Sequence, residues 1–133
     1  MAVANRVVED NVKRSDPQWR RNAKGKFFRL ADIDPPADMP EGGGVYVIWH
    51  GGVKPQWIVV GHNRNLRDHV EKIKKDQEVR SYEVNGGVFV TWSPIIENHR
   101  DGVVNYLIQV LKPLKSSVTR DANAKPIAVY IPG

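Results

Sequence analysis

Two short runs of β-branched and aromatic residues, 45–49 (VYVIW) and 57–60 (WIVV), constrain the fold more than any other feature of this chain. Such residues favour β-strands because their side chains pack well on a pleated surface. The residues between the two runs include Gly51 and Gly52, which suit the tight turn of a β-hairpin. Two buried, antiparallel strands are therefore expected here.

After this hairpin the apolar residues change from strand spacing to helix spacing. Leu66, Val70 and Ile73 recur at intervals of four and three, which places them on one face of a helix. Asn63 or Asn65 is a suitable N-cap, because the side-chain oxygen of asparagine can accept a hydrogen bond from the first helical turn. The sequence therefore predicts a helix directly after the second strand.

The second half of the chain is expected to add a strand and a helix. Residues 88–92 form an alternating run after the Asn-Gly-Gly turn at 85–87, which indicates a third strand. Apolar residues then recur at helical spacing from residue 96 or 97 to residue 111, and Pro113 closes that helix. Residues 126–131 (PIAVYI) fit a final edge strand. The predicted fold class is α+β, a small, mainly antiparallel three-stranded sheet flanked by helices.

Length and composition fit one domain. The chain of 133 residues is long enough for one core and too short for two. Its hydrophobic content of 41% is ordinary for a soluble globular protein, and no apolar run approaches the roughly 20 residues that cross a bilayer. The absence of cysteine excludes disulfides and thiolate metal sites. With no apolar stretch of a secretory signal at the N-terminus, a cytoplasmic location without membrane contact is expected.

Positive charge is concentrated at the N-terminus. Residues 1–29 contain eight Lys or Arg and three Asp or Glu, so their net charge of +5 equals that of the whole chain. We expect this segment to be a basic extension, flexible or partly helical, ahead of a single domain formed by residues 30–133. A basic arm that includes Trp19 can lie along a phosphate backbone, although a solvated tail has the same composition. The arm residues considered for nucleic-acid binding are Arg20, Arg21, Lys24 and Lys26.

Several short motifs occur in a characteristic order. Residues 44–46 (GVY) begin the first expected strand, and 59–61 (VVG) end the second. The next helix begins with 65–69 (NLRDH), and 107–108 (LI) followed by Pro113 end the later helix. Across about 70 residues this order resembles the core of the GIY-YIG nuclease domain. The resemblance implies a mainly antiparallel sheet with helices and, in working members, cleavage of phosphodiester bonds.

The resemblance also implies that most of the catalytic set has been lost. Of the two tyrosines, the arginine and the metal-binding glutamate of the family, only the first tyrosine is kept, as Tyr46. Val59 stands where the second tyrosine is expected, His69 replaces the arginine, and Val104 replaces the glutamate. An aliphatic side chain cannot bind a divalent ion, and histidine does not present a guanidinium group. The leading hypothesis is a non-catalytic GIY-YIG-like domain that binds DNA or another nucleic acid and needs no cofactor.

Two alternatives remain open at this point. In a divergent endonuclease, Tyr46, His62 and His69 would act with Mg²⁺, and the substitute metal ligand would be Asp101, a weak candidate, or Glu97. A protein-interaction scaffold with a protein partner is the weaker alternative. The residues expected to contact nucleic acid beside the second strand are His62, Arg64, Asn65 and Arg67. The sequence predicts neither a pathway nor an oligomeric state.

Overall fold

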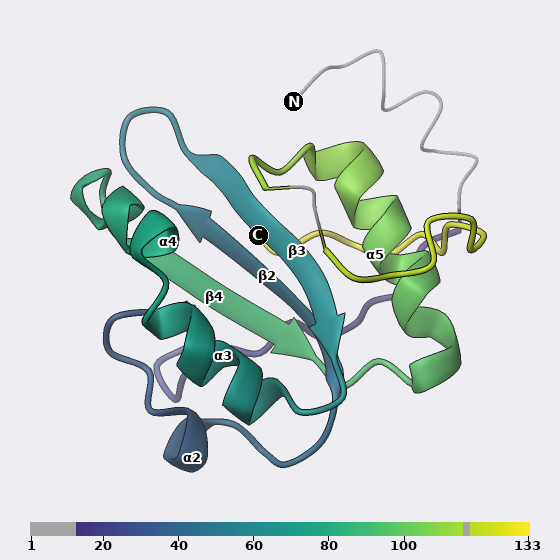
Figure 1. Ribbon diagram of the computed structural model, residues 1–133, viewed down its shortest axis with the longest axis horizontal. Helices are drawn as coiled ribbons and strands as arrows, with labels where there is room; N and C mark the ends of the chain where they lie inside the picture. Colours follow the sequence, from purple (N-terminus) through teal and green to yellow (C-terminus); the bar gives the residue numbers. More distant parts are fainter. Residues whose placement is uncertain (1–12, 116–117) are drawn as a thin grey trace.

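The computed structural model describes residues 13–115 and 118–133, and its centre is an antiparallel sheet (Figure 1). The sheet contains four strands in the order β1-β4-β2-β3. The predicted α+β class is confirmed, and the three expected strands form most of the sheet, to which a two-residue strand is added at one edge. The strands are β1 (Phe28–Arg29), β2 (Gly44–His50), β3 (Gln56–Asn63) and β4 (Val88–Ser93).

Helices cover both faces of the sheet. On one side of the strands in Figure 1 lie α3 and α4, and on the other lies α5. The expected helices after the second and third strands are confirmed as α3 and α5, whereas the sequence does not predict the short helices α2 and α4. The helices are α2 (Pro35–Asp38), α3 (Leu66–Lys74), α4 (Gln77–Ser81) and α5 (Glu97–Leu111), with a single 3-10 turn, η1 (Tyr82–Val84), after α4.

The central strand β2 is buried on both faces, which explains its continuous apolar sequence. Tyr46 and Ile48 belong to the core on the α3 side. Val45 and Val47 point the other way and pack with Val104 and other residues of α5. Because β2 contributes side chains to both cores, it joins the α3 side and the α5 side of the structure.

Two side-chain caps determine where α3 and α4 begin. The Asn65 side chain accepts a hydrogen bond from the backbone N–H of Asp68 at 3.3 Å, as expected for the N-cap of α3. The Asp76 carboxylate accepts hydrogen bonds from the N–H groups of Glu78 and Val79 and so caps α4. The Asp76 side chain also lines a pocket.

The N-terminal extension differs from the expected flexible or partly helical segment within the residues that the structure describes. Residues 13–27 contain no helix; they run beside the end of β4, on the side away from β2, and then lead into β1, which pairs with β4 on that side. The Arg20 N–H donates to the Trp92 carbonyl at 3.1 Å, and the Thr91 hydroxyl donates to the Arg20 carbonyl at 2.7 Å. Polar groups on the edge of β4 thus hold the segment in place. The part of the prediction that concerns residues 1–12 lies outside the described residues.

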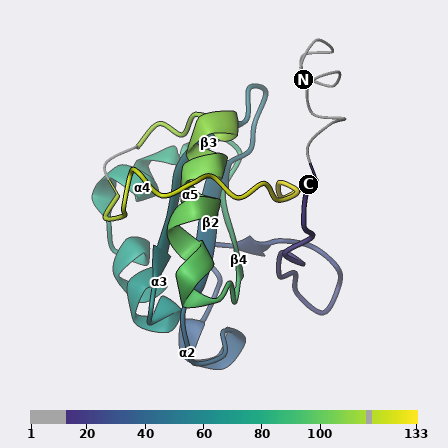
Figure 2. The same cartoon turned by 90° about the vertical axis from the view of Figure 1, so that its right-hand side faces the viewer.

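The C-terminal segment does not form the expected edge strand. Residues 126–131 have one isolated parallel bridge, between Ser15 and Val129, instead of a ladder with the sheet. Figure 2 shows this segment crossing α5 toward the N-terminal segment. The Ser15 N–H donates to the Ala128 carbonyl at 3.2 Å, and the Tyr130 N–H donates to the Ser15 carbonyl at 3.0 Å. The apolar side chains of this segment are therefore used to cover α5, and its backbone pairs with the other end of the chain.

Candidate functional site

A pocket of about 280 Å³ opens between strand β3 and helix α3. Its floor comes from the hairpin strands, one wall comes from α3 and α4, and the chain that follows α5 closes the remaining side. The residues that line it are Tyr46, Val59, Gly61, His62, Asn63, His69, Ile73, Asp76, Val79, Lys115, Val118 and Thr119.

The floor of the pocket depends on the missing side chain of Gly61. Tyr46 on β2 lies directly opposite Gly61 on β3. A Cβ atom at residue 61 would lie 2.6 Å from the Tyr46 hydroxyl oxygen and 2.9 Å from its Cζ. Real Cβ atoms do not approach other atoms so closely, so the tyrosine ring can lie across this strand only because residue 61 is glycine.

His69 binds the hydroxyl of Tyr46. The helical spacing of α3 places this histidine one turn after the N-cap, where its Nε2 lies 2.9 Å from the Tyr46 hydroxyl oxygen. Its Nδ1 lies 3.3 Å from the Asn63 side-chain nitrogen, and the Asn63 side-chain oxygen accepts the N–H of Asn65. Since the asparagine NH₂ faces Nδ1, that nitrogen accepts and the Nε2–H donates to the tyrosine oxygen.

Burial keeps both members of this pair uncharged. Burial lowers the pKa of His69, and the nearby Lys72 lowers it further. Burial raises the pKa of Tyr46 to about 12. The tyrosine oxygen already accepts a hydrogen bond from His69, and within the described residues its own O–H proton has no acceptor. At neutral pH the floor of the pocket therefore presents a neutral hydrogen-bond donor.

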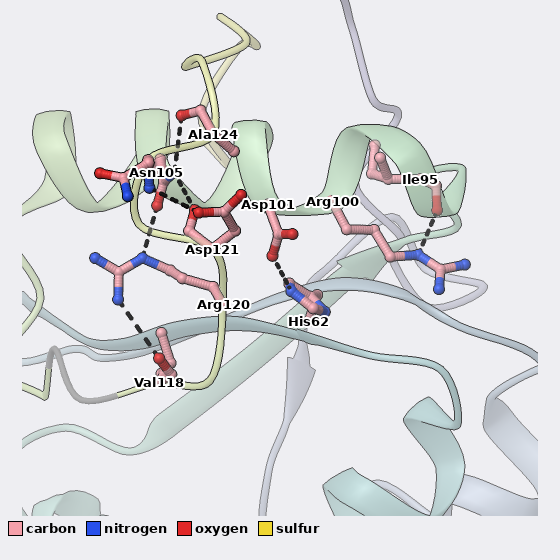
Figure 3. Close-up of polar contacts among 10 residues, drawn as sticks. His62, Ile95, Arg100, Asp101, Asn105, Val118, Arg120, Asp121 and Ala124 are labelled. Carbon is pink, nitrogen blue, oxygen red and sulfur yellow. Dashed lines mark hydrogen bonds and ion pairs between the residues drawn. The ribbon is translucent and has the colours of Figure 1, made fainter.

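His62 is held by Asp101 on the α5 side of the pocket rim. Figure 3 shows the His62 ring pointing toward the Asp101 carboxylate, with Nε2 and Oδ1 2.7 Å apart. Both side chains are partly exposed, at 23% and 36%. Asp101, the weak candidate for a metal ligand, therefore already binds His62. Within the described ranges, no group of three or more His, Asp or Glu side chains is arranged to hold a metal ion.

Lys115 and Asp76 form the charged part of the pocket. The Lys115 Nζ lies 3.7 Å from an Asp76 carboxylate oxygen and 3.1 Å from one of Glu78. The Glu78 hydrogen bond and the neighbouring carboxylates raise the pKa of Lys115, while the Val79 N–H and Lys115 lower that of Asp76. Both groups are charged at neutral pH and offset each other.

Sequence reasoning did not find this ion pair. Lys115 reaches the pocket because the chain after α5 turns back along β3, where the Lys115 N–H donates to the Ile58 carbonyl at 2.8 Å. A parallel bridge joins Lys115 to Val59 at the same place. The sequence contained one usable signal, namely an aspartate followed by a short polar segment typical of an N-cap at residue 76.

Of the other residues expected beside β3, two have structural contacts and one is exposed. Asn65 caps α3, and Arg67 donates to the Met39 carbonyl and lies 3.7 Å from a Glu41 oxygen. Arg64 is exposed in the turn between β3 and α3, and among the described residues it makes no ion pair. Arg64 is therefore the cation at this turn that remains available to a ligand.

The basic arm and the pocket lie at opposite edges of the sheet. β3 is one outer strand, whereas the arm runs along β4 and into β1, the other outer strand. Arg20 donates to the Gln18 carbonyl, and Arg21 donates to the Gly133 carbonyl and lies 3.9 Å above the Phe27 ring. The exposed Lys24 and Lys26 lie on the same segment. The structure thus does not bring the four arm residues together with Tyr46, His62 and His69.

The two valines that stand where the resemblance leads one to expect a tyrosine and a glutamate are both buried. Val59 lines the pocket with 6% of its surface exposed. Val104 is fully buried at 0% in the core between α5 and the sheet, where it packs with Val45 and Val47. Val104 does not line the pocket. At this position of α5 the structure therefore has hydrocarbon packing.

Comparisons with known proteins do not assign this chain to a family. Searches against models of known protein families, curated proteins and solved structures find no significant match to this chain. In the part of the chain that the structure describes, no helix is long and apolar enough to cross a membrane.

Proposed function

We propose that this chain is a GIY-YIG-like domain that binds nucleic acid without cutting it. The Tyr46 and His69 pair, seated over Gly61, is the single observation that carries the proposal. The first motif of the resembled family supplies the tyrosine, the second supplies the glycine, and the helix after them supplies residue 69. All three motif positions line one pocket. Their meeting there supports the proposal that the chain is related to the resembled family and that this pocket corresponds to the family's site.

The contents of the pocket favour binding over cleavage. Hydrolysis of a phosphodiester needs charge stabilisation by a metal ion or by a fixed cation. His69 is neutral and already binds Tyr46, and Lys115 is shared between two carboxylates. Val104 has no access to the pocket. A site with this composition can form hydrogen bonds to a ligand. It offers few interactions that would be stronger with the transition state of cleavage than with the bound strand.

Exposed cations near the pocket supply the expected attraction for phosphate. Arg64 lies at the start of α3, and Lys72 lies close enough to His69 to lower its pKa. Both side chains are exposed, so they can neutralise backbone phosphates at small desolvation cost. Two such contacts predict a slope of about −1.4 for log affinity against log salt on a single strand. The arm is a separate basic surface, and a bound strand would have to pass around the sheet to reach it.

Fluorescence anisotropy with a labelled single-stranded oligonucleotide tests the proposal. We expect binding at 50 mM salt that weakens at 200 mM, and a further loss in Arg64→Ala and Lys72→Ala. Lys54→Ala is the matched control, since this exposed lysine lies in the β2–β3 hairpin turn, away from the pocket. If the wild-type chain does not bind at 50 mM salt, or if Lys54→Ala weakens binding as much as Arg64→Ala, the proposal is wrong.

A divergent endonuclease is the second candidate, and one observation favours it. The Asp76 carboxylate lines the same pocket as Tyr46 and His69, so the pocket contains an acid that can bind a metal ion in place of Lys115. Incubation of plasmid and of branched DNA with Mg²⁺ or Mn²⁺ separates the two candidates. Under our proposal the substrates stay intact. Metal-dependent cleavage that disappears in Tyr46→Phe would establish the endonuclease instead.

A further inference from the structure

We propose that the pocket accepts one unpaired nucleobase of the bound strand, while the phosphates stay outside at Arg64 and Lys72. This inference rests on the proposed binding of nucleic acid and adds which part of the ligand enters the pocket. The group that enters the pocket is the ring of the base, whereas the motifs led us to expect contacts with phosphate.

The charge inside the pocket disfavours a phosphate. Apart from His62, which Asp101 binds, the charged side chains of the lining are Lys115 and Asp76, and Glu78 is the second carboxylate bound by Lys115. A phosphate entering here would lose its hydration and would meet a lysine that two acids already neutralise. Taking an anion out of water without a free partner is costly, while a neutral ring pays no such penalty.

The walls suit a flat, partly apolar group. Val59, Ile73, Val79 and Val118 line the pocket with aliphatic side chains. The volume of about 280 Å³ lies just below the roughly 300–1,000 Å³ range of small-molecule pockets, so it admits one base and not a dinucleotide. Aliphatic contact with the faces of a base would remove apolar surface of both partners from water.

The polar groups of the pocket match the edge of a base. The Tyr46 oxygen receives the Nε2–H of His69, and its own O–H has no acceptor among the described residues, so this proton is available to a ligand. The Asp76 carboxylate is an acceptor, and the exposed Thr119 hydroxyl can act in either role. Base edges carry carbonyl or ring-nitrogen acceptors next to amino donors, and proteins read them in this way when the base is unstacked. A paired base in a duplex does not offer that edge, so the ligand is single-stranded or flipped out.

The test compares oligonucleotides that differ only in their bases. Anisotropy is measured with dT₁₂ and with a 12-mer of abasic tetrahydrofuran units, which keeps the phosphates and lacks every base. We expect the wild-type protein to bind dT₁₂ about tenfold more tightly than the abasic strand. Tyr46→Phe should lose most of that difference and should bind the abasic strand as the wild type does. Tyr130→Phe is the matched control, because this tyrosine is 54% exposed and does not line the pocket.

The outcomes separate this inference from the proposed function. If the abasic strand binds as tightly as dT₁₂, the base does not enter the pocket, the inference is wrong and nucleic-acid binding stands. If Tyr46→Phe weakens both strands equally, the hydroxyl acts through the fold or the phosphates, and the inference is again wrong. If neither strand binds to the wild-type protein, the proposed function itself fails.

Discussion

Substitution of Gly61 by alanine should disrupt the pocket, because the added Cβ would collide with the Tyr46 side chain. The new Cβ would lie 2.6 Å from the Tyr46 hydroxyl oxygen, 2.9 Å from its Cζ and 3.1 Å from its Cε1. Tyr46 is 4% exposed and packs in the α3-side core, so its ring has little room to move away. Overpacking of a filled core costs about 1–3 kcal/mol. Loss of the hydrogen bond to His69 adds about 1 kcal/mol, so unfolding should become easier by about 2–4 kcal/mol.

Urea unfolding of a double-mutant cycle measures this effect. Gly61→Ala, Tyr46→Phe and the combined variant are compared with the wild type by circular dichroism. Removing the hydroxyl relieves the shortest contact and leaves the contacts to the ring carbons, so Gly61→Ala should cost about 1 kcal/mol less in the Tyr46→Phe background. Gly133→Ala is the control, because an added Cβ there meets nothing within 4 Å. A Gly61→Ala variant within about 0.5 kcal/mol of the wild type would refute the stated packing of Tyr46.

Four further predictions concern other parts of the structure. Asp76→Ala should lower the free energy of unfolding by about 1 kcal/mol through loss of the α4 cap, whereas Asp76→Asn keeps the cap and should cost less. The pKa of Asp76 is lowered in the folded state, so its charge stabilises the fold at pH 6. The difference in urea stability between wild type and Asp76→Asn should therefore disappear as the pH falls below 3.8 and through the folded pKa. A difference that stays constant with pH would contradict this. Val104→Glu should destabilise the protein by about 3–5 kcal/mol, since it buries an unpaired carboxylate in the core. It should not produce Mg²⁺-dependent cleavage, because residue 104 does not line the pocket, and a gain of cleavage would contradict that placement. Trp19→Ala should lower the melting temperature and expose the N-terminal segment to limited proteolysis. The reason is that the indole packs on the core between α5 and the sheet, and its Nε1–H donates to the Tyr130 carbonyl at 2.7 Å. Unchanged proteolysis would show that Trp19 does not hold the segment in place.

The strands and long helices were predictable because their own residues determine them. β2 is apolar on both faces, and only a central strand between two cores requires that pattern. The spacing of Leu66 and Val70 and the cap at Asn65 likewise define α3 locally. Such elements carry their signal within a few residues, so a single sequence is sufficient to find them.

The chain ends were not predictable for the opposite reason. Residues 13–24 have the composition of a solvated tail, yet Trp19 fills a place in the α5-side core and Arg20 bonds to the backbone of β4. The segment 126–131 has the composition of a strand, yet its backbone partner is Ser15 at the other end of the chain. Both outcomes depend on contacts between residues about 70 or more positions apart, which local patterns do not encode.

The candidate site was predictable only in part. The motif resemblance named Tyr46 and His69, and in the structure their polar atoms lie 2.9 Å apart. It gave no indication that Asn63 would fix the tautomer of His69, or that Lys115 would reach the same pocket. These contacts come from the path of the backbone along β3 and not from any spacing in the sequence.

The central claim is that this pocket binds a nucleic-acid strand and leaves it intact. One labelled dT₁₂ sample, incubated with the wild-type protein and Mg²⁺ at 50 mM salt, gives both readouts when anisotropy is followed by a denaturing gel. We predict a raised anisotropy that falls when salt is brought to 200 mM, together with a full-length strand on the gel. A strand shortened in the wild-type sample and intact with Tyr46→Phe, or an anisotropy equal to that of the free strand, would contradict the claim.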